Sequence, residues 1–312
     1  MTFVPFDLIA TEAQLSQVNE SQHFRNAECV EELGLLLLPC EDYRKEILTL
    51  LQNMESQNAK QKWSKAFISI LKNKRIISIN SHQGWKNIEG SLTENEEFQF
   101  IKLICSQNIN QQVGLRLKEE QGIDLCSFAT FDISENLLEI KKHRDKEIFV
   151  GEKVADIWEK YFRVLARFSQ KVVICDRYLF TNVLINRNNS LRYFLKLLTM
   201  DSGVPHLQIL SSAPKHQADF FLTGIEKIVK DFPIEKYELV AIEDRPFKKL
   251  AHARYILFDN DVCKIDKGLE LFGKASAKCN FSLSKWRDLG NEVNRKIADL
   301  IRLSSDIRTG PK

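Results

Sequence analysis

Three residues in the last quarter of the chain have types and spacing that suit phosphate chemistry. They are His252, Arg254 and Asp259, in the pattern H-x-R-x-x-x-x-D. A strand, in which side chains alternate between faces, would carry His252 and Arg254 on the same face. The histidine could attack phosphorus or take a proton, and the arginine could hold two phosphate oxygens at once. The pattern therefore predicts a site for a phosphate group.

This octet differs by one residue from the H-x-K-x-x-x-x-D signature of the phospholipase D superfamily, since Arg254 stands where lysine is usual. Segment 252–272 reads HARYILFDNDVCKIDKGLELF and resembles the end of the phospholipase D-like domain found at the C-terminus of MIT-domain proteins. Segments 174–179, 190–198 and 206–212 resemble that domain's opening strand end, its first helix and its next strand. The resemblance extends over residues 150 to 273.

The resemblance implies a mixed sheet flanked by helices and a metal-independent reaction, with no cofactor. One histidine would attack a phosphodiester, a second would protonate the leaving oxygen, and basic residues would hold the phosphate. Such a site needs two copies of the motif. This chain has one, because His23 and Arg25 are followed by Val30 at the acidic position. We therefore expect a homodimer that pairs His252 with its counterpart, acting as a phosphodiesterase, most simply a nuclease. A prokaryotic defence or toxin component would suit such an activity.

A non-catalytic alternative has equal standing. The eukaryotic domains that the chain resembles are regarded as non-hydrolytic modules that bind membrane lipid and self-associate. On that interpretation the C-terminal half dimerises and binds a partner protein or a phosphate-bearing ligand such as nucleic acid.

Four further residues are candidates for phosphate or ligand binding. Asp176 and Arg177 follow a predicted strand, at the carboxyl edge where α/β sheets bind ligands. Lys264 and Lys267 follow the octet. The plainer interpretation of Asp176 and Arg177 is a structural Asp–Arg contact at a strand end, of the kind that the segment 243–245, Glu-Asp-Arg, also predicts.

A second alternative lies in the N-terminal half. Glu96, Glu97, Asp132 and Glu135 could be metal ligands of a PIN-like ribonuclease, because two-metal hydrolysis uses carboxylates from strand ends. Acidic residues also collect at helix starts through the helix dipole. The first strand that we identify, 35–38, lacks the aspartate that such a fold would place there.

Hydrophobic periodicity predicts an α/β protein. In the C-terminal half we expect a buried helix 152–169 containing Trp158, then a run of strands and helices and a loose tail. The expected elements are strand 171–175, helix 190–200, strand 206–211, helix 219–231, strand 237–242, hairpin 252–265 with its turn at 260–261, and helix 283–303. In the helix-rich N-terminal half we expect strands 34–38, 75–79 and 125–133, helices 43–54, 61–71 and 96–106, and a loop 81–95. The charge-dense segment 139–150 divides the chain into domains 1–142 and 143–312.

Composition sets the remaining limits. The chain has 45 basic and 42 acidic side chains among 312 residues, a net charge of +3. This is not the large positive excess that is typical of proteins that bind nucleic acid or an anionic membrane over much of their surface. Seven scattered cysteines, never in C-x-x-C, are typical of reduced thiols. The sequence has no apolar run near the ~20 residues of a membrane helix and no secretory signal at its start. We therefore expect a cytoplasmic protein.

Overall fold

The chain forms two compact units, Met1–His143 and Arg144–Lys312, which we call the N-terminal and C-terminal units and describe separately. The division falls one residue from the boundary that the charge-dense segment predicts. The structure is a computed structural model, and it describes residues 2–5, 18–38, 41–72, 76–78, 103–105, 111–142, 145–201, 204–250, 253–273, 276–277, 280–286 and 289–311.

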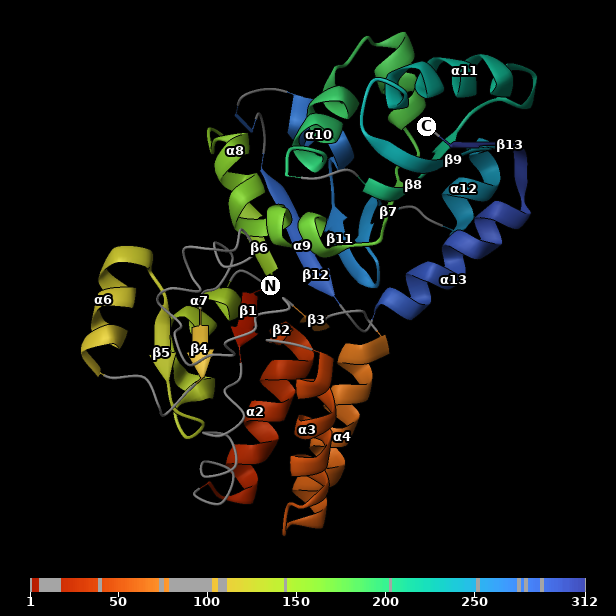
Figure 1. Ribbon diagram of the computed structural model, residues 1–312. Helices are drawn as coiled ribbons and strands as arrows, with labels where there is room; N and C mark the ends of the chain where they lie inside the picture. The colour runs from red at the N-terminus through yellow and green to blue at the C-terminus, as the bar shows by residue number, and fades with distance from the viewer. Residues whose placement is uncertain are drawn as a thin grey trace. The chain divides into compact units, whose positions relative to one another are not determined.

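The C-terminal unit is built on one mixed sheet of eight strands, in the order β13-β9-β8-β7-β10-β11-β12-β6 (Figure 1). Its strands are β6 (Asp145–Ile148), β7 (Lys171–Cys175), β8 (Val204–Ser212), β9 (Ile234–Ile242), β10 (Tyr255–Phe258), β11 (Asp261–Ile265), β12 (Phe281–Trp286) and β13 (Ser304–Pro311). The three central strands β7, β8 and β9 are parallel, and every other neighbouring pair is antiparallel. The strand order thus reverses at β7, because the chain adds β8 and β9 on one side of this strand and then β10 and β11 on its other side.

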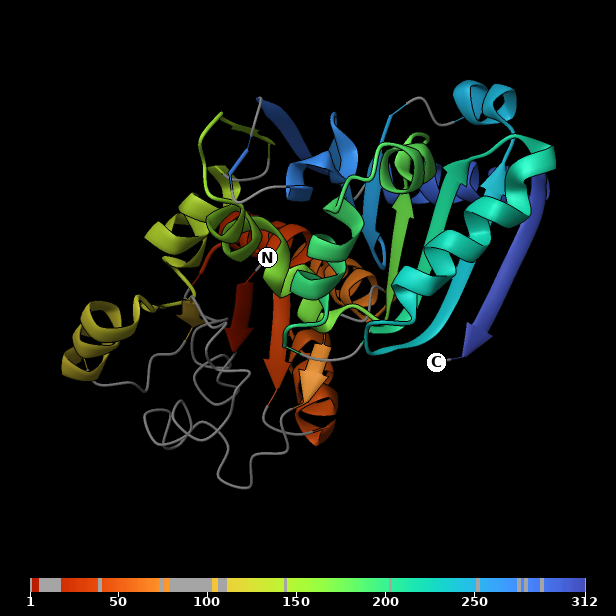
Figure 2. The same ribbon diagram turned by 90° about the horizontal axis from the view of Figure 1, so that it is seen from above.

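Helices cover both faces of this sheet, and Figure 2 shows α11 and α13 on opposite sides of the strands. The helices are α8 (Val154–Ile157), α9 (Arg163–Phe168), α10 (Ser190–Leu198), α11 (Ala218–Val229), α12 (Asp244–Leu250) and α13 (Leu289–Arg302). One face packs Val173, Cys175, Leu257 and Val262 against Val293 and other residues of α13. Since both faces are buried, the central strands are almost continuously apolar, which is why the sequence pattern identifies them.

Five expected elements of this unit are present, each as the helix or strand that the sequence predicts. The strands expected at 171–175, 206–211 and 237–242 are β7, β8 and β9, and the helices expected at 190–200 and 219–231 are α10 and α11. The buried helix expected at 152–169 is also present. It contains a π-helical turn over Trp158–Phe162 between α8 and α9, and Trp158 is 1% exposed.

Three expectations for this unit are wrong in detail. The hairpin's first strand begins at Tyr255 rather than at 252, and Asp259 and Asn260, not 260–261, form its turn. Residues 283–286 belong to β12, so only the second part of the expected helix exists, as α13. The tail that we expected to be loose is β13, which pairs with β9.

The N-terminal unit is a smaller α/β arrangement. Strands β1 (Thr2–Pro5), β2 (Gly34–Leu38) and β3 (Ile76–Ser78) are parallel neighbours, β4 (Leu103–Cys105) pairs in parallel with β5 (Asp124–Cys126), and β4 lies beside β1 (Figure 2). Its helices are α2 (Glu20–Leu33), α3 (Glu41–Gln52), α4 (Gln57–Lys72), α6 (Gln111–Gln121) and α7 (Glu135–Lys142). Trp63, Phe67, Phe128 and Phe131 belong to its apolar core.

Corrections in this unit concern short elements. The first strand is β1, not 35–38, and residues 103–105 form β4 rather than the end of a helix. The strand expected at 125–133 stops at Cys126, because Phe128 and Phe131 enter the core from a turn and a short 3-10 helix. The loop expected at 81–95 lies outside the described residues.

Candidate phosphate-binding site

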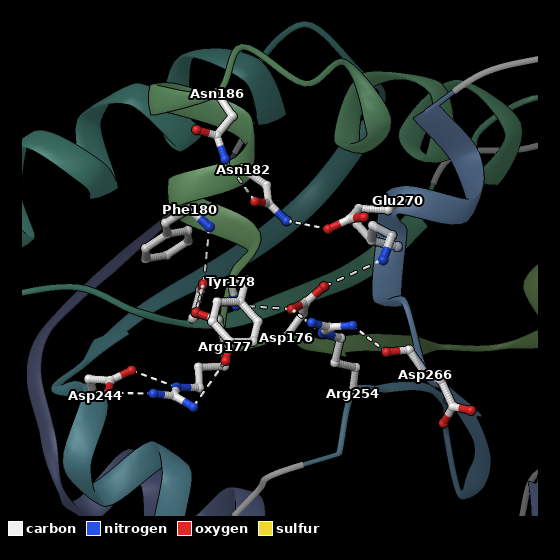
Figure 3. Close-up of polar contacts among 12 residues, drawn as sticks. Asp176, Arg177, Tyr178, Phe180, Asn182, Asn186, Asp244, Arg254, Asp266 and Glu270 are labelled. Carbon is white, nitrogen blue, oxygen red and sulfur yellow. Dashed lines mark hydrogen bonds and ion pairs between the residues drawn. The ribbon is translucent and has the colours of Figure 1, made fainter. Parts of the chain in front are cut away.

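The topology of the C-terminal unit brings two charged residues together at one edge of its sheet. Cys175, the last residue of β7, lies opposite Tyr255, the first residue of the antiparallel β10. Asp176 directly follows β7 and Arg254 directly precedes β10, so their side chains meet beyond the carboxyl end of β7 (Figure 3). This is the point at which the chain reverses its course through the sheet, where open α/β sheets bind ligands.

Asp176 is buried beneath this site, and its exposed fraction is 3%. Its carboxylate accepts hydrogen bonds from the backbone N–H groups of Tyr178 at 3.0 Å and Leu269 at 3.4 Å. The Nε of Arg254 lies 3.4 Å from its Oδ1. Burial raises the pKa of Asp176, and the Tyr178 amide and the Arg254 charge oppose that shift. The carboxylate therefore depends on these partners for its charge.

Arg254 is held on three sides and open on the fourth. Besides the contact with Asp176, one terminal amino group donates to the backbone carbonyl of Asp266, and the guanidinium carbon lies 4.9 Å from the centre of the Tyr178 ring. The side chain is 19% exposed. Among the described residues, its second terminal amino group has no hydrogen-bond partner. A guanidinium fixed in this way can offer its free edge to an oxyanion.

A second arginine near the same edge is fully occupied. Arg177 forms a two-bond fork with Asp244, from Nε to Oδ1 and from one amino group to Oδ2, each at 2.5 Å. Its other amino group donates to the hydroxyl of Tyr178 at 3.1 Å. The fork raises the pKa of Arg177 and lowers that of Asp244. This pair is the structural Asp–Arg contact that the plainer interpretation of the sequence predicts, so Arg177 is engaged rather than open to a ligand.

Asp259 lies at the opposite end of β10 from Arg254. The five intervening steps correspond to roughly 16 Å along an extended chain. Its carboxylate accepts the backbone N–H groups of Gln170 at 3.1 Å and Lys171 at 3.0 Å, at the start of β7. With a φ of 52°, Asp259 occupies the left-handed conformation that the tight hairpin turn requires. The structure thus gives Asp259 a role in the turn and does not bring it to Arg254.

The remaining predicted residues are divided. His252 lies outside the described residues. Lys264 pairs with Tyr255 across the strands, so the two share a face, which is opposite to the face of Arg254. Lys267 is exposed in the turn after β11, next to Asp266, whose carbonyl binds Arg254. Of the candidates, Asp176 and Arg254 are therefore in contact, and Lys267 directly follows the residue whose carbonyl binds Arg254. Lys264 lies on the other face of the sheet.

Sequence reasoning missed two contributors to the site, the carbonyl of Asp266 and the amide of Leu269. Both are backbone groups, for which residue type gives no signal. Figure 3 also shows Asn182 donating to Glu270 at 2.8 Å, which joins the helical turn after β7 to the segment after β11. Tyr178 comes directly after Asp176 and Arg177, in the segment that the sequence already indicated as a lining of the site.

Two carboxylates of the metal-dependent alternative, Asp132 and Glu135, have separate partners. Both oxygens of Asp132 are bound by α2, at 2.7 Å from Gln22 Nε2 and 2.8 Å from Arg25 Nε. Glu135 pairs with Lys118 at 2.8 Å. Glu96 and Glu97 lie outside the described residues. Within the described part of the chain, no three His, Cys, Asp or Glu side chains are grouped so that they could hold a metal ion.

Comparison with known proteins does not assign the chain to a family. No protein-family model matches it, and no curated protein sequence matches it. Among solved structures it is similar to TrmBL2, an archaeal chromatin protein described as showing a novel mode of DNA binding, with 13% sequence identity over 78% of this chain and 82% of that one. The TM-score of 0.27 is too low to establish a common fold, so this match supports no inference here. No helix in the described residues is long and apolar enough to cross a membrane.

Proposed function

We propose that the C-terminal unit is a phospholipase D-like domain that binds a phosphate-bearing ligand at the free edge of Arg254. The observation that carries this proposal is the arrangement of Arg254 itself. A buried carboxylate fixes its Nε at 3.4 Å and a carbonyl holds one amino group, while the other amino group has no partner among the described residues. The sheet topology and the resemblance of segment 252–272 agree with this assignment.

The chemistry of the site favours an oxyanion. Asp176 is too deeply buried to meet a ligand directly, and it orients the guanidinium from behind. The plane of an arginine fork matches two oxygens of a phosphate, whereas a lysine would offer a single point charge. The arginine in place of the usual lysine therefore suits tight, oriented binding.

Binding is tested with the full chain and inorganic phosphate, followed by ³¹P NMR titration. Arg254→Ala should weaken binding at this site by about 1.5–3 kcal/mol, the value for losing a charged hydrogen bond. Arg192→Ala is the matched control, because Arg192 is an exposed arginine of the same unit that pairs with Asp231. If Arg254→Ala and Arg192→Ala both bind phosphate as the unmodified chain does, the assignment is wrong.

The second candidate function is phosphodiester hydrolysis by a homodimer. What favours it is the position of His252, two residues before Arg254 in the chain. A ring nitrogen of His252 would attack phosphorus while His252 of a second copy gives its proton to the leaving oxygen. Water would then hydrolyse the phosphohistidine, and its proton would pass to the second histidine. Nucleic acid is the natural first substrate to test.

Hydrolysis makes a distinct prediction. His252→Ala should abolish cleavage of single- and double-stranded nucleic acid even in EDTA, because the nucleophile is a side chain and not a metal-bound water. Arg254→Lys should keep part of the activity, because lysine is the usual residue of the motif. Sedimentation should find the full chain as a dimer at micromolar concentration. Metal-dependent cleavage that survives His252→Ala would refute this mechanism and direct attention to Asp132.

A further inference from the structure

The N-terminal unit has its own carboxyl edge. Helix α2 ends at Leu33 and β2 begins at Gly34, so the end of the helix lies at the amino edge of the parallel strands. The helix continues for 14 residues, about 21 Å at 1.5 Å per residue, and it contacts the short 3-10 helix Phe131–Ile133. Residues 127–132 follow the carboxyl end of β5, and side chains of α2 bind Phe128 and Asp132 in this segment.

A buried polar network joins α2 to that segment. Asn26 is fully buried and donates to the carbonyl of Phe128 at 2.6 Å. Gln22 donates from Nε2 to Asn26 at 3.0 Å and to Asp132 at 2.7 Å. Asp132 is 8% exposed. Each buried polar group thus has a partner, and the network holds the Asp132 carboxylate rigidly at the edge of the unit.

Arg25 stands on the outer side of this network. Its Nε donates to Asp132 at 2.8 Å, and one amino group donates to the Oε1 of Gln22 at 2.5 Å. The side chain is nevertheless 53% exposed. Its other amino group has no partner among the described residues. Arg25 therefore repeats the arrangement of Arg254: a buried carboxylate on Nε, a neutral oxygen on one amino group, and a free edge.

Two other arginines, Arg163 and Arg308, do not share this arrangement. Arg163 uses Nε and both amino groups on Asp201 and Glu159. Arg308 places its two amino groups on Asp219, Glu226 and Thr223. An arginine whose fork is used up by carboxylates is structural, whereas one that is fixed through Nε and open outward has the geometry of a ligand clamp.

We propose that Arg25 is a second oxyanion site, which binds the phosphate group of a small ligand independently of Arg254. Asp132 is then a positioning residue that holds the guanidinium plane, rather than a metal ligand. Its partner Asp132 follows the carboxyl end of β5, which is parallel to β4, and α/β units bind phosphorylated ligands beyond such strand ends. The shared chemistry is a terminal phosphate, whether free or carried on a nucleoside.

The test uses the full chain carrying Arg254→Ala, so that the site in the C-terminal unit is silent. This parent is titrated with inorganic phosphate and with AMP, and binding is followed by ³¹P NMR. We expect saturable binding of at least one probe, weakened about tenfold or more by adding Arg25→Gln. Tighter binding of AMP than of phosphate would identify the ligand as a phosphate ester, and the reverse would identify free phosphate.

A second variant separates binding from folding. Arg25→Lys keeps a positive charge beside Asp132, so the network should stay folded, but its single ammonium group will be taken up by Asp132 and binding should still fall about tenfold. Arg116→Gln, an exposed arginine on α6, is the control and should bind as the parent does. The proposal is overturned if the parent shows no saturable millimolar binding of either probe, or if Arg25→Lys binds both probes as well as the parent.

Discussion

Gly268 lies directly against Asp176. A Cβ atom at Gly268 would stand 2.1 Å from Oδ2 of Asp176 and 2.7 Å from Cδ of Arg254, and the φ of Gly268 is +57°. Glycine is therefore required here twice, by the backbone conformation and by the close approach of the carboxylate. The backbone after β11 can reach Asp176 because no side chain intervenes.

Gly268→Ala should disturb both folding and phosphate binding. The left-handed conformation costs about 1–2 kcal/mol for a residue with a Cβ, and the clash must displace Asp176 or Arg254 at further cost. Gly122→Ala is a matched control, since Gly122 has a φ of +65° with nothing within 4 Å of its Cβ position. Urea unfolding should find Gly268→Ala less stable than Gly122→Ala, and phosphate titration should find weaker binding only in Gly268→Ala. If the two variants lose equal amounts of stability and of phosphate binding, the close contact between Gly268 and Asp176 contributes to neither.

Asp176→Asn should separate stability from binding. Burial raises the pKa of Asp176 in the folded state, so this carboxyl binds its proton more tightly there than in the unfolded chain. Its ionisation therefore costs stability as the pH rises above about 3.8, through the raised pKa. Asparagine carries no such cost, and Arg254 can reach water because its side chain is 19% exposed.

We therefore expect the free energy of unfolding of Asp176→Asn at pH 7 to equal or exceed that of the unmodified chain. Phosphate binding should weaken, because the Nε of Arg254 loses its charged anchor. Urea unfolding and ³¹P titration measure the two effects. A large loss of stability would show that the Asp176–Arg254 pair stabilises the fold rather than serving the site.

The sequence predicts the buried part of the C-terminal sheet well and its margins poorly. The central strands are identifiable because burial on both faces requires apolar residues throughout. Strand β13 was missed because SSDIRTGP has one large apolar residue, and the strand is held instead by pairing with β9 and by Arg308. Strand β12 was taken for helix because Leu283 and Trp286 continue the spacing of α13, as Leu289 and Val293 show.

The sequence predicts only part of the site, because some of its groups are identified by residue type and others only by the fold. Residue types and strand ends point to Asp176 and Arg254, and the structure brings these two together. Asp259 shares the octet with Arg254, but the strand between them carries it to the other end of the sheet. The groups that complete the Arg254 site are backbone atoms and a neighbouring ring, and their positions depend on the fold rather than on any motif.

Trp158→Ala should destabilise the chain by roughly 3–5 kcal/mol, as removal of large core side chains does. The indole is 1% exposed and packs against three phenylalanines, with ring centres 5.9 Å from Phe162, 5.9 Å from Phe194 and 6.2 Å from Phe272. Lys160→Ala, exposed on the same π-helical turn, is the control and should change stability by about 0.5 kcal/mol or less. Urea unfolding measures both, and a loss below about 1 kcal/mol for Trp158→Ala would contradict its place in the core.

The C-terminal strand should be held by a pH-dependent contact at Glu226. This carboxylate accepts hydrogen bonds from the Tyr237 hydroxyl at 2.6 Å and from Arg308 of β13 at 3.0 Å, and it pairs with Lys230 at 2.9 Å. These partners lower the pKa of Glu226 from 4.5 to about 2. Because the folded-state pKa is the lower one, the contact contributes its full stability above about pH 4.5 and loses it as the pH falls toward 2.

Glu226→Gln should therefore lower the free energy of unfolding near pH 7 by roughly 1–2 kcal/mol, a value reduced by solvent screening at this partly open site. The difference from the unmodified chain should shrink as the pH falls from 4.5 toward 2, where Glu226 itself becomes neutral. Glu235→Gln, on an exposed position of β9, should differ from the unmodified chain by about 0.5 kcal/mol or less at every pH. Urea unfolding of the three proteins at several pH values measures these differences. A difference for Glu226→Gln that stays constant down to low pH would mean that the side chain acts through its packing, and that β13 is held without the charge of Glu226.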